Sequence, residues 1–190
     1  MVVIPPAPKI LTRFPSYMSE QFGNWELIDA EHELYENIDQ SDIKFKGFVD
    51  CIIKTKNSKG KDEIWIIDWK TTGASGWDGF KQPNGKFYAK KSDFTYTSQI
   101  GFYKKFISEK LGIDLKDIKC AFIFLKRGTT QEKSIDILKV SAGPKFIEKV
   151  DKLLKQMINM VNKGMYFKNQ ENCKYCPFAN SEHCNGHKDW

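Results

Sequence analysis

The sequence lacks the features of a membrane or secreted protein. No apolar run approaches the roughly 18 residues that a membrane span requires, and the N-terminus, Met-Val-Val-Ile-Pro-Pro-Ala-Pro, has no basic stretch followed by an apolar core. We therefore expect a cytoplasmic protein with no membrane partner. The chain is not poor in hydrophobic residues (41%) or aromatics (14%), as a disordered chain would be. Its net charge of +6 is a mild excess, compatible with a polyanionic partner.

Cysteine is scarce except near the C-terminus. Cys51 and Cys120 each stand alone in an apolar, β-branched run, and we expect them to be buried as small hydrophobic residues. The other three cysteines all fall in the last 18 residues. Without a visible signal peptide, this clustering indicates a metal site more than a disulfide framework.

The order of predicted elements indicates a mixed α/β (α+β) protein. Four prolines in residues 1–24 predict an extended arm with at most one short helical turn. Strand patterns follow at 25–35, 44–54, 63–70, 119–125 and 134–140, and helical patterns at 98–111 and 144–162. We expect three parts: the arm, a core over 25–168, and a small Cys/His-rich tail over 169–190 packed on that core.

The predicted strand that ends at Lys70 carries two charged residues on one face. Successive strand residues point to opposite faces, so Asp68 and Lys70 share a face. Burying either charge without a partner is costly. Asp50 ends the first strand of the predicted hairpin and is expected beside Asp68. Two adjacent carboxylates repel, which a shared proton or a bound cation relieves, and Mg²⁺ prefers such oxygen ligands. The alternative interpretation is an Asp–Lys ion pair on the surface of a hairpin.

Two further features strengthen the first interpretation. Gln99 and Tyr103 are four residues apart on a predicted helix, so they lie on one helical face and can both hydrogen-bond toward a sheet or a phosphate. Gly47 precedes Asp50 by three residues.

These motifs in this order resemble the RecB-like branch of the PD-(D/E)XK nucleases. That branch includes helicase-linked recombination nucleases, CRISPR-adaptation nucleases and many phage exonucleases. The matching set covers about residues 25–185 and comprises Gly47-Phe-Val-Asp50, Asp68-Trp-Lys70-Thr-Thr, Gln99-x3-Tyr103 and Cys-x2-Cys-x7-Cys. The resemblance implies a central mixed β-sheet flanked by helices, a restriction-endonuclease-like core, and hydrolysis of DNA phosphodiesters that depends on Mg²⁺ or Mn²⁺.

The resemblance also assigns roles to individual residues. Asp50 and Asp68 are expected to bind the metal together with the backbone carbonyl of Trp69, and Lys70 is the expected catalytic lysine. Gln99 and Tyr103 are expected to support the site and the DNA strand.

The N-terminal part of the chain departs from the pattern of the family. Many relatives have a metal-binding His on an N-terminal helix and an additional acidic residue, whereas this chain has no convincing helix of that kind. We expect Glu31 to be the additional acid, with Glu33 as the next candidate, because either can fall beside the carboxylates of the hairpin. His32 is expected to be structural.

Lysines and aromatic residues are interspersed between positions 80 and 110. Lysines neutralise backbone phosphates, and aromatic rings stack on unpaired bases whatever the sequence. The alternative is a solubilising loop with its aromatic residues folded into the core. The residues expected to contact DNA are Lys90, Lys91, Lys104, Lys126 and Arg127.

The C-terminal tail contains two chelating pairs, Cys173-x2-Cys176 and Cys184-x2-His187. Three thiolates and one imidazole suit tetrahedral zinc, with His183 as the competing fourth ligand. In relatives with an iron–sulfur cluster, three C-terminal cysteines join a fourth from far upstream, but no cysteine here precedes Cys51. An iron–sulfur cluster completed by Cys51, Cys120 or a partner, and a tail without metal, are the alternatives.

The resulting expectation is a metal-dependent DNA nuclease, an exonuclease that acts on DNA ends or single strands in recombination, repair or phage DNA metabolism. A helicase or recombination protein is the expected partner, and a phage-encoded protein would act in the cytoplasm of its bacterial host. The alternatives are a non-catalytic DNA-binding subunit of a nuclease/helicase complex and an RNA-directed enzyme of the same fold. Paired carboxylates argue against a pure binding subunit, since they repel phosphates.

Overall fold

The computed structural model divides the chain into two compact units, Met1–Leu153 and Leu154–Trp190. Their boundary falls inside a helix, α3, and not at the predicted junction between residues 168 and 169. The residues described by the structure are 7–39, 41–73, 94–165, 173, 176–178, 181–182 and 184. The sheet and the candidate site both lie in the first unit.

The first unit is built on a five-stranded mixed sheet with the order β1-β2-β3-β4-β5. Neighbouring strands are antiparallel except β3 and β4, which are parallel. The strands are β1 (Trp25–Asn37), β2 (Lys44–Lys56), β3 (Asp62–Thr72), β4 (Ile118–Lys126) and β5 (Ile135–Val140). Each lies within a few residues of its predicted position, and the predicted mixed α/β class is confirmed.

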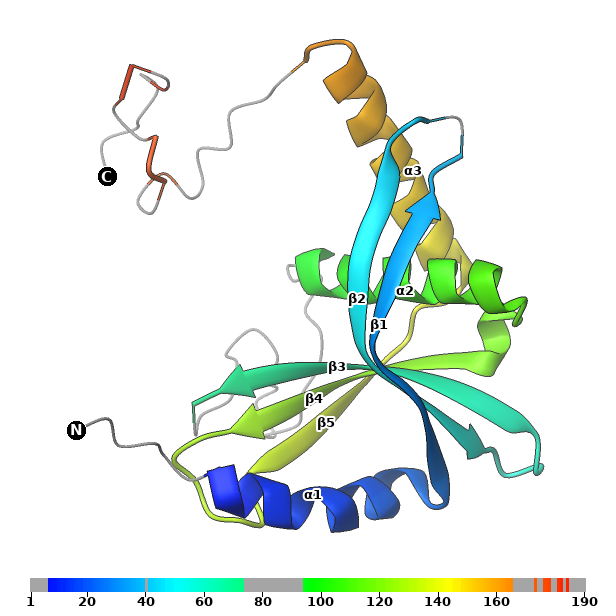
Figure 1. The fold of residues 1–190 in the computed structure, drawn as a ribbon, viewed down its shortest axis with the longest axis vertical. Helices are drawn as coiled ribbons and strands as arrows, with labels where there is room; N and C mark the ends of the chain where they lie inside the picture. The colour runs from blue at the N-terminus through cyan, green and yellow to red at the C-terminus, as the bar shows by residue number, and fades with distance from the viewer. Residues whose placement is uncertain are drawn as a thin grey trace. The chain divides into compact units, whose positions relative to one another are not determined.

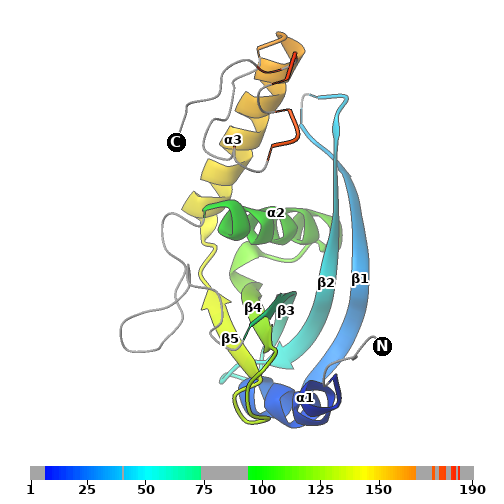
Figure 2. The same cartoon turned by 90° about the vertical axis from the view of Figure 1, so that its left-hand side faces the viewer.

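Helices cover both faces of the sheet. Two parallel strands need a long crossover, and α2 (Phe94–Leu111), followed by the short helix η2 (Leu115–Asp117), lies in the connection between β3 and β4. Figures 1 and 2 show the sheet between α2 on one side and α1 (Ala7–Phe22) on the other. This is the helix-flanked, restriction-endonuclease-like arrangement that the sequence predicted. Over the described residues, no helix has both the length and the apolar character needed to cross a membrane.

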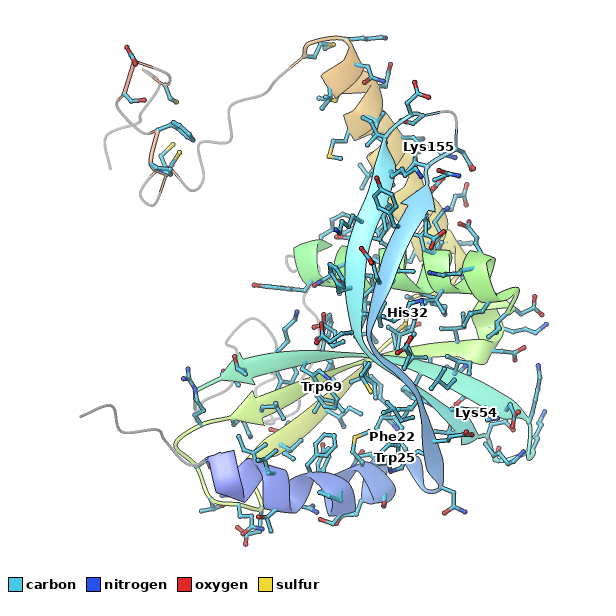
Figure 3. All side chains as sticks on the ribbon, in the orientation of Figure 1. Phe22, Trp25, His32, Lys54, Trp69 and Lys155 are labelled. Atoms are coloured by element: carbon cyan, nitrogen blue, oxygen red, sulfur yellow. The ribbon has the colours of Figure 1, made fainter. Side chains whose placement is uncertain are left out.

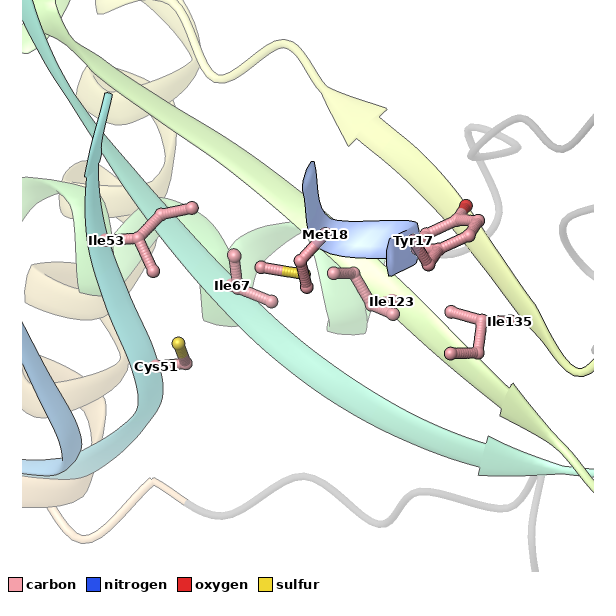
Figure 4. Close-up of a cluster of buried hydrophobic side chains, with 7 residues drawn as sticks. All are labelled: Tyr17, Met18, Cys51, Ile53, Ile67, Ile123 and Ile135. Carbon is pink, nitrogen blue, oxygen red and sulfur yellow. The ribbon is translucent and has the colours of Figure 1, made fainter. Parts of the chain in front are cut away.

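The N-terminal segment is a helix, which corrects the prediction of an extended arm over residues 1–24. Pro15 lies inside α1, where a proline removes one backbone hydrogen bond and crowds the preceding turn. Packing on the sheet offsets this penalty. Tyr17 and Met18 are buried in a cluster with side chains of β2, β3, β4 and β5 (Figure 4), and the Phe14 and Trp69 rings lie 5.3 Å apart.

The opposite face of the sheet packs on α2, whose buried side chains include Ile100, Phe106 and Ile107. α3 (Pro144–Asn162) has the bounds predicted from its three- and four-residue apolar spacing. Its first half lies against α2, where a Cβ on Gly101 would stand 2.9 Å from Phe146 Cε1. A side chain at residue 101 would therefore require the Phe146 ring to move.

Candidate active site

Asp50 lies where β2 separates from β3. The pairing of these strands ends at Cys51 and Ile67, whereas β2 continues to pair with β1. Beyond that point the backbone N–H of Trp69 donates to Oδ2 of Asp50 at 2.7 Å. A buried N–H without a partner costs about 1–3 kcal/mol, so this bond holds the carboxylate at the point where the two strands diverge.

Asp68 and Lys70 lie on the same face of β3, as predicted. Nζ of Lys70 is 2.5 Å from Oδ2 of Asp68, and their β4 neighbours in register are Phe122 and Phe124. Asp68 is only 2% exposed. The intervening Trp69 packs on the α1 side of the sheet (Figure 3). The alternative of a surface ion pair is therefore wrong, because this pair is enclosed by the sheet and α2.

The buried carboxylate of Asp68 faces the ammonium of Lys70, and no other described residue hydrogen-bonds to its Oδ2. Burial raises the pKa of Asp68, Lys70 acts in the opposite direction, and the charge of Asp50 adds to the increase. The Asp50–Asp68–Lys70 group therefore holds two carboxylates and one ammonium, and a further cation would relieve the repulsion between the carboxylates.

α2 extends the site through Gln99 and Tyr103. Oε1 of Gln99 lies 3.5 Å from Nζ of Lys70, and its Nε2 donates to the Tyr103 hydroxyl at 2.9 Å. Burial raises the pKa of Tyr103, and the charges of Asp68 and Asp50 also raise it. The Lys70–Gln99–Tyr103 chain links the helix to the two carboxylates, so the predicted four-residue spacing does bring these side chains together.

Gly47 is explained by the position of Tyr103. A Cβ at residue 47 would lie 3.0 Å from Cε1 of Tyr103 and 3.1 Å from Cε1 of Phe45. The Phe45 ring is itself stacked on Phe106 of α2, with a centroid distance of 4.4 Å. Any side chain at this position would push Tyr103 away from Gln99.

Tyr96 and Phe122 also belong to the site, although they were not among the predicted residues. Their ring centroids lie 5.6 and 5.7 Å from Nζ of Lys70, close enough for cation–π attraction. Helical spacing could have identified Tyr96, which precedes Gln99 by three residues and therefore shares its face. Phe122 could be found only from the register of β3 and β4.

The donor set fits a hard divalent cation. Asp50 and Asp68 supply carboxylate oxygens, and among the described residues the partner of Asp68 Oδ2 is the Lys70 ammonium. Mg²⁺ and Mn²⁺ prefer oxygen ligands and complete their shells with waters and substrate phosphates. These two residues, with the backbone carbonyl of Trp69, are the ones that would hold such an ion.

Glu31 is not brought into a cluster with these carboxylates. It is exposed, has a φ of 52°, and follows a register shift between Leu27 and Asp29. No group of three or more His, Cys, Asp or Glu side chains forms a metal site among the described residues. His32 is fixed by a 2.6 Å contact between its Nδ1 and Oδ2 of Asp29, which agrees with a structural role.

The predicted DNA-contacting residues have different outcomes. Lys104 is 6% exposed, and burial lowers its pKa, so its prediction as a surface phosphate contact is wrong: it lies on the side of α2 that is buried, not the side that faces solvent. Lys126 pairs with Asp136, and Arg127 is exposed. Lys90 and Lys91 lie outside the described residues.

Among the described residues, no cysteine forms a disulfide bond. Cys51 and Cys120 are buried, as predicted, and burial raises the pKa of their thiols to about 11 and about 12. Cys51 belongs to the cluster on the α1 side, away from Asp68. In the second unit, Cys173 is buried and Cys176 exposed. His183 and His187 lie outside the described residues, so the zinc site stays a prediction.

Comparison with known proteins establishes the family. The model of the PD-(D/E)XK nuclease superfamily matches residues 7–181, a span that includes α1 and the whole sheet. The chain therefore belongs to the PD-(D/E)XK nuclease superfamily, whose members generally use divalent metal ions such as Mg²⁺ or Mn²⁺.

Two solved structures are similar to this chain. The chain is similar to a protein from Eubacterium rectale, provisionally named an exonuclease, with a TM-score of 0.52 at 13% identity over 96% of this chain and 60% of that one. It is also similar to the protein SSO0001, with a TM-score of 0.44 at 19% identity over 90% of this chain and 69% of that one. No curated protein matches the chain.

Proposed function

We propose that this protein is a divalent-metal-dependent DNA nuclease of the RecB-like branch, acting as an exonuclease on DNA ends or single strands. One observation carries the proposal: the buried carboxylate of Asp68 is paired with Lys70 on one face of β3 and lies within the electrostatic influence of a second carboxylate, Asp50. In a chain that only bound DNA, two carboxylates beside a phosphate would weaken the binding.

The proposed metal ligands are Asp50, Asp68 and the Trp69 carbonyl, with Glu31 as a further candidate if β1 rearranges around it. A bound Mg²⁺ or Mn²⁺ would supply positive charge for the phosphate oxygens and lower the pKa of a bound water. Asp50 is held for this task by the Trp69 N–H. Asp68, now paired with Lys70, would be the second carboxylate to hold such an ion.

Lys70 is the proposed catalytic lysine. Its ammonium, once released from Asp68, stays positioned by Gln99 and by the Tyr96 and Phe122 rings. From there it orients the attacking water and offsets negative charge that develops on the phosphate. Gln99 and Tyr103 are positioning residues, which hold this geometry through their mutual hydrogen bond.

The likeness to a provisionally named exonuclease supports action on DNA ends, as do the RecB-like motifs Asp50, Asp68-x-Lys70 and Gln99-x3-Tyr103. We further propose a helicase or recombination protein as partner, a cytoplasmic site of action, a phage or bacterial DNA pathway, and zinc at Cys173, Cys176, Cys184 and His187. An iron–sulfur cluster at these cysteines is the alternative.

The test is cleavage of end-labelled single-stranded DNA, duplex DNA and RNA with Mg²⁺, Mn²⁺ or EDTA. Wild-type protein is expected to degrade DNA only with a divalent cation, and to release mononucleotides or short products from ends. Asp68→Ala and Lys70→Ala should each abolish cleavage, whereas Asp62→Ala, at an exposed aspartate of the same strand, should not. A wild-type protein that binds DNA but never cuts it would instead be the non-catalytic subunit.

A further inference from the structure

The β1–β2 arm exposes two aromatic rings on one face. Tyr35 is 58% exposed and Phe48 is 43% exposed, although aromatic side chains normally supply buried area. Two lysines accompany them. Nζ of Lys44 lies 4.7 Å from the Tyr35 centroid, and Nζ of Lys46 lies 5.6 Å from the Phe48 centroid. We call Tyr35, Lys44, Lys46 and Phe48 the arm face.

The strand register groups these residues. Tyr35 of β1 is the direct partner of Lys46 of β2, and the ammonium beside its ring is that of Lys44, two residues before Lys46 on the same face. On β2, residues 44, 46 and 48 alternate with residues on the opposite side. Each exposed ring is therefore held beside a cation and available on its free surface.

The arm face continues into the candidate active site. Phe48 and Asp50 are two residues apart on β2, so alternation places their side chains on the same side of that strand, opposite to the side on which Gly47 meets Tyr103. Two residues along a strand span about 7 Å, and a stacked DNA strand advances about 3.4 Å per nucleotide. Phe48 is thus within two or three nucleotides of the phosphate that Asp50 would face.

The charge of the arm face suits a polyanion. Lys44 and Lys46 are both exposed, and Glu33, the cross-strand partner of Phe48, lies 3.4 Å from Nζ of Lys46. An exposed ion pair of this kind contributes at most about 1 kcal/mol, so a phosphate can replace Glu33 as the partner of Lys46. Lysines beside exposed rings are the combination that holds single-stranded nucleic acid through its backbone and bases together.

We infer that the arm face binds the single-stranded DNA that enters or leaves the active site, with bases stacked on Phe48 and Tyr35 and phosphates at Lys46 and Lys44. This inference rests on the proposed function, because the arm face would deliver the DNA strand to the proposed active site. It assigns a DNA-binding role to residues of β1 and β2, outside the lysine-rich segment that the sequence favoured.

The test is fluorescence anisotropy with a labelled oligothymidine and with an abasic strand of equal length, using the full chain with no divalent cation added. Tyr35→Ala and Phe48→Ala should each weaken oligothymidine binding about tenfold, and the double variant about 100-fold, from stacking worth about 1–3 kcal/mol per base. The abasic strand retains phosphates but no bases, so its binding should change little. Phe48→Trp should retain wild-type affinity.

Leu11→Ala is the matched control, since Leu11 is an exposed apolar residue of α1 (68% exposed) away from the arm face. Wild-type affinity of the double variant, or equal losses on both strands, would overturn the inference. So would a double variant that changes only the self-association of the protein, because the arm face would then be a protein interface. Binding is measured without turnover, so failure of the wild type to cleave DNA with Mg²⁺ would count against the proposed function alone.

Discussion

Gly47→Ala tests whether the contact between β2 and Tyr103 organises the site. The added Cβ would lie 3.0 Å from Cε1 of Tyr103 and 3.1 Å from Cε1 of Phe45. Neither ring can yield easily: Tyr103 is buried and bonded to Gln99, and Phe45 is stacked on Phe106.

Two effects of opposite sign set the size of the change. Overpacking a fitted core costs about 1–3 kcal/mol, whereas replacing glycine by alanine stabilises a compatible position by about 0.4–1 kcal/mol. We expect Gly47→Ala to lower the free energy of unfolding by about 1–2 kcal/mol. It should also slow DNA cleavage, because displacement of Tyr103 moves Gln99 away from Lys70.

Urea unfolding and cleavage rates measure both effects. Gly73→Ala is the control, since Gly73 directly follows β3 and no described residue lies within 4 Å of its added Cβ. In a Tyr103→Ala background, Gly47→Ala should cost much less, because the ring that it strikes is absent. Equal stability of Gly47→Ala and Gly73→Ala, with no coupling to Tyr103, would refute this account of the glycine.

Three other predictions follow from burial and bonding. Lys104→Met should raise the free energy of unfolding by about 1 kcal/mol near pH 7. Burial lowers the pKa of Lys104, so the unfolded state binds more protons than the folded state between that lowered pKa and about 10.5. Urea unfolding measured at increasing pH should therefore show the advantage of the variant shrinking toward about pH 10.5. Asp50→Asn should keep an acceptor for the Trp69 N–H and stay stable while losing cleavage, whereas Asp50→Ala should also lose about 1–3 kcal/mol; equal stabilities would remove the structural role of that bond. Elemental analysis should find zinc in a colourless protein, and a brown protein with iron and labile sulfide would replace zinc by a cluster.

Most elements could be predicted from the sequence because their periodicity is strong. Pro144–Asn162 shows clean helical spacing, and its bounds were predicted correctly. The shared face of Asp68 and Lys70 followed from strand alternation alone. The helical face of Gln99 and Tyr103 followed from their four-residue spacing in the same way.

The errors arose where tertiary packing decides the outcome. The prolines of the first 24 residues concealed α1, whose stability comes from Tyr17 and Met18 packing on the sheet. Lys104 lies on a helix with apolar residues on several sides, so its burial depends on the placement of α2 against β4. Glu31 stays a prediction: the pairs Ala30–Cys51 and His32–Val49 flank Glu31 and Asp50 in the register, but alternation cannot foresee the φ of 52° at Glu31.

The central claim is that Asp68 belongs to a hydrolytic centre and is not merely a buried structural carboxylate. The most direct test is the Mg²⁺-dependent cleavage rate of Asp68→Asn on end-labelled DNA, since the amide keeps the shape of the side chain and removes its charge. We expect a loss of about 1,000-fold, equivalent to about 4 kcal/mol of barrier, with a urea unfolding curve close to that of the wild type. Cleavage within a few-fold of the wild-type rate by a folded Asp68→Asn protein would contradict the account.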